Sequence, residues 1–242
     1  MDQNSQMLPK LIAIIPARGG SKGIPKKNLE QINGISLVGH AVQFALSTNL
    51  FDSICVSTDS TEISLDAKEN GCNLIINRPA ELSGDTISDQ PVLRHAVLEA
   101  ENLMKTTFDI VVMLQPTSPI RSTQELTEGI KRVKYFNHDS AWSVKIVDLH
   151  YHPRKQFSLL DGTLINYVAE DLVTSRHLLD RTYVRTGCFY VYKKEVVLND
   201  FNLMGNSCSG VITDLETVNI DTHEDLLYLR KISEKSKERL FR

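Results

Sequence analysis

Apolar residues follow two different spacings along the first half of the chain. Short, nearly continuous apolar runs alternate with longer segments in which apolar residues recur at helical spacing. The runs predict strands at residues 11–15, 53–57, 73–76 and 110–114, and the longer segments predict helices at 37–47, 62–70, 89–105 and 122–135. Strands and helices in this order are typical of an α/β fold. We therefore predict three αβα layers around a mostly parallel sheet.

The second half of the chain has a different character. We expect strands at residues 141–147, 163–168, 187–192 and 217–220, and a last helix that begins at His223. Between them, residues 148–185 are richer in cations, aromatic residues and turn residues. We therefore predict a core made of residues 11–147 and 186–242, with residues 148–185 as a protruding insertion.

Composition limits the classes of protein. The chain has 242 residues, 41% of them hydrophobic and 24% charged, and a net charge of −3. This charge gives no reason to expect binding to nucleic acid. No apolar run approaches the roughly 20 residues of a membrane span, and residues 1–10 lack the apolar centre of a signal peptide. The four cysteines show no metal-ligand spacing. We expect a cytoplasmic protein with reduced thiols and no membrane partner.

The loop after the first strand carries the strongest chemical signal. The chain turns at Pro16 and enters a loop that contains the glycines Gly19, Gly20 and Gly23 and the cations Arg18, Lys22, Lys26 and Lys27. Glycines let backbone N–H groups approach an anion, and cations supply the opposite charge. The loop is not a Walker A motif, because Ile24 and Pro25 follow Gly23. It predicts a nucleotide-phosphate site; the alternative is an ordinary surface loop with scattered lysines.

Residues 12–29 resemble the signature of the cytidylyltransferases that activate sialic acids and related nine-carbon acidic sugars. The resemblance extends from Leu11 to Leu226, and Gly23 stands where the enzymes for pseudaminic acid usually carry Arg. It implies a nucleotide-diphospho-sugar transferase fold, which is glycosyltransferase-A-like, with an insertion that binds sugar and forms a homodimer. It further implies Mg²⁺ as cofactor, and CTP and an acidic nine-carbon sugar of sialic or legionaminic type as substrates. The products would be a CMP-sugar and pyrophosphate.

Two further strand ends carry polar groups, and groups at the carboxyl ends of neighbouring parallel strands meet in one crevice. Arg78 precedes Pro79, which fixes the turn, so its guanidinium can read a base with paired donors; the alternative is a salt bridge to Glu81 or Asp85. The neutral, proline-bounded loop at 115–119 suits recognition of hydroxyl groups, although it could simply end a strand. Relatives that activate the sugar acid KDO usually have Gly-Asp in this loop.

Asp221 is the candidate magnesium ligand, because Mg²⁺ prefers oxygen. The alternative is that Asp221 or Thr222 caps the last helix, since Thr222 and Asp225 have the spacing of a capping box. The resembled family commonly has Asp-x-Asp here, and in this chain the first of the two is Asn219. One negative charge is therefore missing, so metal affinity or metal number can differ.

The resemblance assigns roles to individual residues. The catalytic residues are Arg18, Lys22, Lys27 and Asp221. The nucleotide contacts are Ala17, Arg18, Gly19, Gly20, Ser21, Lys22, Lys27, Asn28, Arg78, Ser83 and Asp85. The sugar contacts are Gln115, Thr117, Ser118, Lys155, Arg176, Arg185 and Thr186, and the metal ligands are Asp221 and Asn219. The sequence does not rank the cations that could bind the sugar carboxylate, and it does not identify the sugar.

Other functions remain open at this point. The same reaction on KDO or pseudaminic acid is one alternative, and transfer of a nucleotide to a hexose phosphate is another. The loop at Gln115 and the basic insertion argue against KDO and hexose phosphates. A binding module without catalysis is the third alternative, because a fold does not determine a function.

Overall fold

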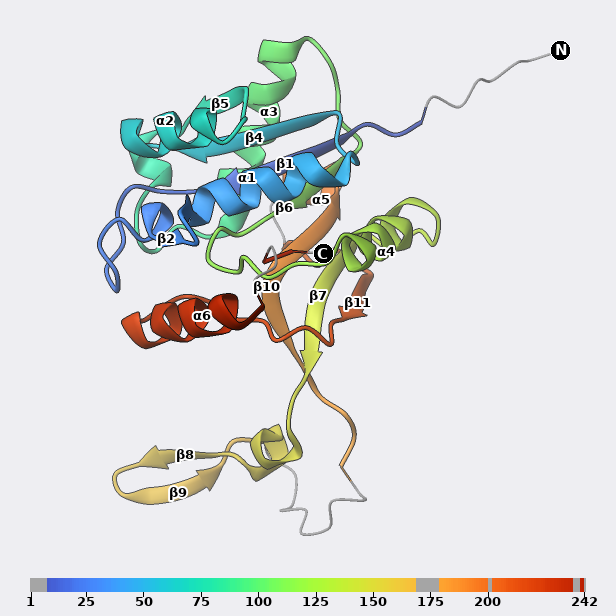
Figure 1. Ribbon diagram of the computed structural model, residues 1–242. Coiled ribbons are helices and arrows are strands. Elements are labelled where there is room, and N and C mark those ends of the chain that lie inside the picture. Colours follow the sequence, from blue (N-terminus) through green and yellow to red (C-terminus); the bar gives the residue numbers. More distant parts are fainter. Residues whose placement is uncertain (1–7, 169–178, 200–201, 237–239, 242) are drawn as a thin grey trace, which may run out of the picture.

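The computed structural model describes residues 8–168, 179–199, 202–236 and 240–241. Within them a central sheet carries helices on both faces, and an arm projects away from this core (Figure 1). The sheet has the strand order β11-β7-β10-β6-β1-β4-β5. Its strands are β1 (Leu11–Pro16), β4 (Ser53–Thr58), β5 (Leu74–Asn77), β6 (Ile110–Met113), β7 (Ser140–Ile146), β10 (Tyr183–Lys193) and β11 (Cys208–Ile212).

The sheet is mostly parallel, as the sequence predicts. Strand β1 pairs in parallel with β4 and with β6, and β4 pairs in parallel with β5. Strand β10 is the exception, because it lies antiparallel between β6 and β7. Since the parallel strands all point the same way, the loops that follow β1, β4, β5 and β6 meet at one edge of the sheet.

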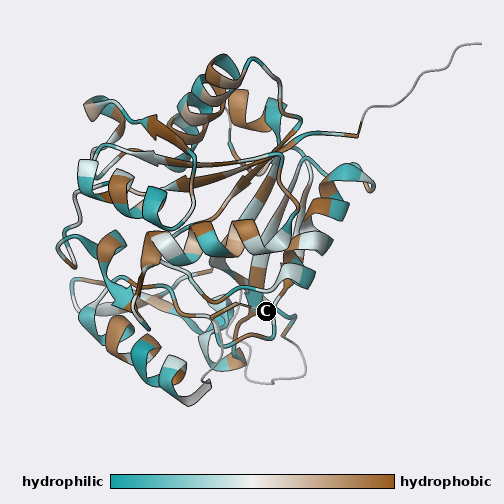
Figure 2. Cartoon of the chain, turned by 45° about the horizontal axis from the view of Figure 1, so that its top comes forward, coloured by the Kyte–Doolittle hydropathy of each residue, from teal (hydrophilic) through white to brown (hydrophobic). Residues whose placement is uncertain are grey.

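Alternate residues of β1 explain the three layers. Ala13 and Ile15 pack with the apolar faces of α1 (Leu37–Thr48), α2 (Thr61–Glu69) and α4 (Thr123–Lys134). Ile12 and Ile14 point to the other face, where they pack with α3 (Asp89–Met104) and α5 (Lys194–Leu198). Apolar residues accordingly concentrate on the strands and on the inward sides of the helices (Figure 2). The predicted αβα arrangement is confirmed.

Serine caps place the starts of three helices. The side chains of Ser36, Ser60 and Ser122 accept hydrogen bonds from the backbone N–H groups of Gly39, Ile63 and Glu125 at the starts of α1, α2 and α4. Each bond satisfies an N–H group that the first helical turn leaves unpaired. None of the described helices combines the length and the apolar character that a membrane crossing requires.

A third apolar cluster brings the end of the chain to the loop after β1. Helix α6 (His223–Ser236) buries Leu226 and Leu229 against Ile24 in that loop and against Ile32 in the small hairpin of β2 (Gln31–Ile32) and β3 (Ile35–Ser36). This packing carries the segment that precedes α6 alongside the basic loop.

The strand predicted at 217–220 is wrong. Val218 and Ile220 alternate with polar residues as in a strand, but they are buried in the third cluster and not in the sheet. The segment makes a backbone hydrogen bond from Ile220 N to Thr117 O, 2.9 Å long, which ties it to the loop after β6. In the central sheet, the sequence analysis missed β11, which pairs with β7. Strand β10 also begins earlier than predicted. The prediction missed its first residues because Tyr183 and Val184 are exposed and belong to no buried apolar run.

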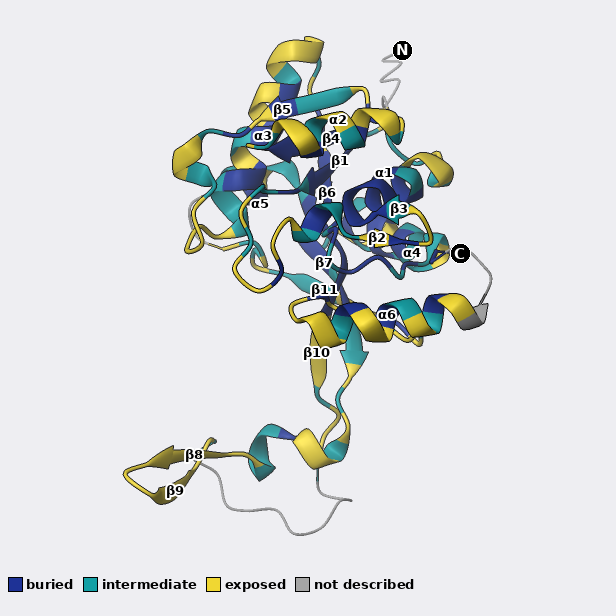
Figure 3. Ribbon diagram, turned by 60° about the vertical axis from the view of Figure 1, so that its left-hand side comes forward, coloured by how far each residue is buried: buried dark blue, intermediate teal, exposed yellow. Residues whose placement is uncertain are grey.

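The arm leaves the core after β7. It contains two 3-10 turns, Leu149–Tyr151 and Pro153–Lys155, and a hairpin of β8 (Phe157–Leu160) and β9 (Thr163–Asn166). Strand β9 is two residues shorter than the strand predicted at 163–168. Every residue of this hairpin is exposed, including Phe157, Leu159 and Leu164 (Figure 3). A two-stranded hairpin with no apolar cover is at best marginally stable in water.

Candidate functional site

A cavity of about 240 Å³ opens at the edge of the sheet where the parallel strands end. Three sequence segments form its wall, and they follow β1, β5 and β6. Its lining residues are Pro16, Arg18, Gly20, Ser21, Lys27, Asn28, Arg78, Leu82, Gly84, Asp85, Ile87, Asp89, Val92, Gln115, Pro116 and Thr117. The cavity thus joins residues that the sequence analysis selected from separate loops.

Two cations of the basic loop converge on one carboxylate. Arg18 Nη1 lies 2.7 Å from Asp85 Oδ1, and Lys22 Nζ lies 2.8 Å from Asp85 Oδ2. The hydrogen bonds from Lys22 and Arg18 hold the pKa of Asp85 below its usual range. Ion pairs exposed in this way contribute little to stability. A triphosphate carries more negative charge than one carboxylate, so it can displace Asp85 and bind Arg18 and Lys22.

Buried polar contacts hold the loop in shape. Asn28 is buried and donates a 2.9 Å hydrogen bond from Nδ2 to the backbone O of Arg18. The N–H groups of Ala17 and Gly19 are also engaged, with Ser57 O at 3.0 Å and Asp59 Oδ1 at 2.8 Å. Of the predicted nucleotide contacts in this loop, Ala17, Gly19 and Lys22 are not part of the cavity lining.

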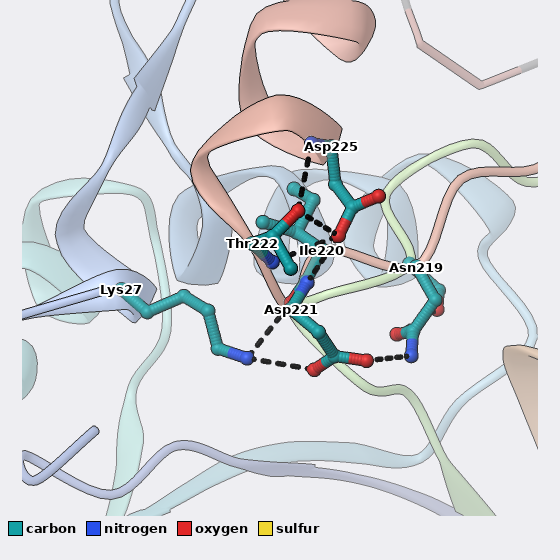
Figure 4. A network of polar contacts seen from close by, with 7 residues as sticks. Lys27, Asn219, Ile220, Asp221, Thr222 and Asp225 are labelled. Atoms are coloured by element: carbon teal, nitrogen blue, oxygen red, sulfur yellow. Dashed lines mark hydrogen bonds and ion pairs between the residues drawn. The ribbon is translucent and has the colours of Figure 1, made fainter. Parts of the chain in front are cut away.

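Lys27 connects the basic loop to the segment before α6 (Figure 4). Its Nζ donates to Ile220 O at 2.7 Å and to Asp221 Oδ1 at 3.0 Å. The two backbones also approach closely, because a Cβ atom at Gly23 would lie 2.5 Å from Asp221 O. The ammonium group is thus fixed between the cavity and Asp221, and only 15% of the Lys27 side chain is exposed.

The cap of α6 leaves the Asp221 carboxylate available. Asp225 Oδ2 accepts from Thr222 N at 2.8 Å, and Thr222 Oγ1 accepts from Asp225 N at 3.2 Å, so the two residues form the reciprocal contacts of a capping box (Figure 4). Burial opposes ionisation of Asp225, but backbone hydrogen bonds from Thr222 and Asp221 outweigh it and lower the pKa of that carboxyl. Thr222 and Asp225 therefore cap the helix without the side chain of Asp221.

The surroundings of Asp221 suit a metal that substrate oxygens also bind. Its two oxygens accept from Lys27 and from Asn219 Nδ2, the second at 2.9 Å. Asn219 Oδ1 in turn accepts from Ser118 Oγ at 3.2 Å. Within the described part of the chain, no group of three or more His, Cys, Asp or Glu residues could hold a metal ion. Mg²⁺ commonly binds one or two carboxylates and completes its shell with substrate phosphates and water, so one exposed carboxylate fits it.

Arg78 is nearly buried, with 6% of the residue exposed. Its Nε and Nη2 donate to Ser57 Oγ and Ser57 O at 3.2 and 2.7 Å, and burial lowers the pKa of its guanidinium. The salt bridge to Glu81 or Asp85 that the sequence left open is not formed within the described residues. The side chain lines the cavity, where its remaining donors can meet a ligand.

Gln115 and Thr117 line the cavity, and a buried network holds their loop. Arg121 is fully buried and donates to the backbone oxygens of Gln115 and Cys188. The Ser118 hydroxyl, which lies between Asn219 Oδ1 and Thr186 O, is 3.1 Å from the latter. Thr186 is buried, and its hydroxyl contacts Ser143 Oγ at 2.7 Å. Ser118 and Thr186 thus connect the loop to β10 and are not part of the lining.

A second cavity, of about 330 Å³, lies beside the first. Its lining residues are Ser88, Asp89, Gln90, Met113, Trp142, Arg185, Tyr190, Tyr192, Asn202 and Leu203. Of the predicted sugar contacts, Arg185 lies here. Lys155 lies in the 3-10 turn Pro153–Lys155 of the arm and lines neither cavity. Arg176 lies outside the described residues.

The sequence analysis missed Asp89, which lines both cavities. It is the first residue of α3 and follows Ser88, so it has the pattern of an ordinary helix start. Ser83, which the sequence analysis selected, lies next to the site: its backbone O accepts from Arg18 Nη1 at 3.4 Å.

Comparisons with known proteins found a matching family and a shared fold. A family model described as cytidylyltransferase matches residues 12–150. Post-translational flagellin modification protein B of Campylobacter coli is 28% identical and covers 90% of this chain and 92% of its own length. CMP-N,N'-diacetyllegionaminic acid synthase of Campylobacter jejuni is 26% identical, with coverage of 94% and 99%. The solved structure of a CMP:2-keto-3-deoxy-manno-octonic acid synthetase complexed with CTP has a TM-score of 0.68 at 18% identity, with coverage of 94% and 99%, and shows a shared fold.

Proposed function

Because the chain belongs to the cytidylyltransferase family, we propose that it couples CTP to an acidic nine-carbon sugar, giving a CMP-sugar and pyrophosphate. The observation that carries this proposal is the convergence in one cavity of the basic loop, Arg78 and Gln115. These residues supply phosphate contacts, a base contact and a neutral hydrogen-bonding group at the edge of the sheet where ligands of such folds bind.

The reaction needs no covalent intermediate. The anomeric hydroxyl of the sugar attacks the α-phosphorus of CTP, and pyrophosphate leaves in line. Catalysis then consists of positioning and of stabilising the charge that develops on phosphate oxygens. Arg18 and Lys22 leave their ion pairs with Asp85 and bind the triphosphate instead. Lys27 contacts the leaving pyrophosphate, and Asn28 keeps the loop in place through its bond to Arg18 O.

We propose Mg²⁺ as the cofactor, with Asp221 as a ligand and Asn219 beside it. When bound, the ion neutralises charge on the phosphates. Because Asn219 is neutral, we expect weaker binding of the metal than a pair of carboxylates gives.

A legionaminic or sialic acid is the substrate that the relatives favour, since a similar protein is named as a synthase of CMP-N,N'-diacetyllegionaminic acid. Pseudaminic acid and KDO are the alternatives. The test is release of pyrophosphate from CTP and Mg²⁺ with each of these four sugar acids. Release with one nine-carbon acid supports the proposal and names the substrate. No release with any of them would favour a module that binds without catalysis.

Replacing Arg78 with Ala is expected to relax the choice of base. Its guanidinium is held in place by hydrogen bonds to Ser57 and lines the cavity. It can therefore bind the base without losing side-chain entropy at that moment. Loss of a charged hydrogen bond corresponds to about 1.5–3 kcal/mol, or roughly 10–150-fold in kcat/KM for CTP. The measurement is the ratio of kcat/KM for CTP over UTP, and an unchanged ratio would contradict this role.

We also propose a homodimer that forms through the arm. Its support is the exposure of Phe157, Leu159 and Leu164 on a hairpin that lacks apolar cover. Light scattering during gel filtration would show twice the chain mass for a dimer, and a monomer mass would contradict it. All four cysteines are free thiols, as is usual for proteins of a reducing compartment. We therefore propose that the protein is cytoplasmic.

A further inference from the structure

Asp89 stands where the two cavities meet. It is the one described residue that lines both the cavity with the basic loop and the cavity with Arg185. If CTP occupies the first cavity and the sugar acid extends from Gln115 of the first cavity into the second, the hydroxyl that attacks the α-phosphorus lies near this junction. This step rests on the proposed function.

The Asp89 carboxylate is half-buried, and among the described residues it has no hydrogen-bond or ion-pair partner. Its charged and titratable neighbours are Arg78, from the segment after β5, and Arg185, Tyr190 and Tyr192 of β10. Because Asp89 lines both cavities and no protein group donates to its carboxylate, its oxygens are open to a ligand there. A partly buried carboxylate with a raised pKa in a cleft is a candidate functional group.

We propose that Asp89 is the general base of the reaction. Its Oδ atom takes the proton of the anomeric hydroxyl as the sugar oxygen forms its bond to the α-phosphorus. The bond between the α-phosphorus and the oxygen bridging to the β-phosphorus breaks, and its electron pair leaves on pyrophosphate. Asp89 then returns the proton to water, so no oxidant, reductant or further reactant is needed.

The other candidates are less suited to accept this proton. Asp85 is ion-paired with Arg18 and Lys22, and Asp221 accepts from Lys27 and Asn219. Burial raises the pKa of Tyr190 to about 12, so its phenol stays protonated at neutral pH. Burial also raises the pKa of Asp89, against the opposing effect of Arg185 and Arg78, and a raised pKa makes a carboxylate a better base.

The test is a kinetic comparison of wild type with Asp89→Asn and Asp89→Glu. Removing a general base lowers kcat by about 10²-fold, and we expect that loss for Asp89→Asn with KM values within about threefold of wild type. Wild-type kcat should fall as pH falls through the pKa of Asp89, at a pH above the ordinary aspartate range, because the protonated acid cannot accept. Asp89→Asn should lose this acidic limb, and Asp89→Glu should retain it with part of the rate.

Glu99→Gln is the matched control, because Glu99 is an exposed carboxylate on the same helix. It should leave kcat unchanged. Asp89 also adds negative charge to the first turn of α3, which by itself stabilises a helix, so melting temperatures are measured in parallel. A kcat for Asp89→Asn close to wild type, or an acidic limb that survives in it, would overturn the base role alone. A wild-type protein that releases no pyrophosphate would overturn the proposed function and the base role with it.

Discussion

Lys27→Ala is expected to lower kcat about 10³-fold and to weaken CTP binding far less, because it removes a donor aimed at charge that develops on the leaving group. The ammonium of Lys27 is held by Ile220 O and Asp221 Oδ1, and it lines the cavity. A group fixed before the reaction spends no energy on reorganisation when pyrophosphate takes up its charge. We expect Arg18 and Lys22 to bind the triphosphate in the ground state of this variant as in the wild type.

The measurement is turnover at saturating CTP, together with calorimetric binding of CTP. Lys26→Ala is the comparison variant, because Lys26 is adjacent, more exposed and paired with Glu62 at 2.7 Å. It should change turnover much less. Unchanged turnover of Lys27→Ala at saturating CTP would contradict the role, and an equal loss in both variants would indicate a general effect of loop charge.

Elements with a local pattern were predictable from the sequence. The strand at 11–15 and the helix at 37–47 show their period within their own residues, and both were found with ends shifted by about one residue. Val218 and Ile220 show the limit of this argument. They alternate as in a strand, but the apolar partner that buries them is α6 and not a second sheet face. Which surface covers an alternating segment depends on the tertiary fold.

In the candidate site, too, some residues were predictable from the sequence and others were not. Arg18, Lys27 and Arg78 were selected because each follows an apolar strand, and the parallel sheet brings such positions to one edge. Asp89 gave no such signal, because an acid in the first turn of a helix is ordinary. Its significance comes from the two cavities that meet at it, and these form from segments far apart in the sequence.

The loop at Gln115 packs closely against Gly187 of β10. Gly187 has φ +79°, in the left-handed region, and a Cβ atom there would lie 2.8 Å from Gln115 Oε1 and still closer to Ser118 Oγ. Gly187→Ala therefore combines backbone strain with a collision, at a cost of about 1–2 kcal/mol for the first and 1–3 for the second. In a chain of this length, about 3 kcal/mol lowers the melting temperature by roughly 6–12 °C.

Gly34→Ala separates these two effects. Gly34 has φ +80°, nearly the same backbone conformation, but nothing lies within 4 Å of its Cβ position. We expect it to lose only the strain component of stability and to keep the KM for the sugar. Gly187→Ala should lose more stability and also raise that KM, because Gln115 and Ser118 must move apart from β10. Equal melting temperatures and equal KM values for the two variants would show that the close approach of β10 does not position the Gln115 loop.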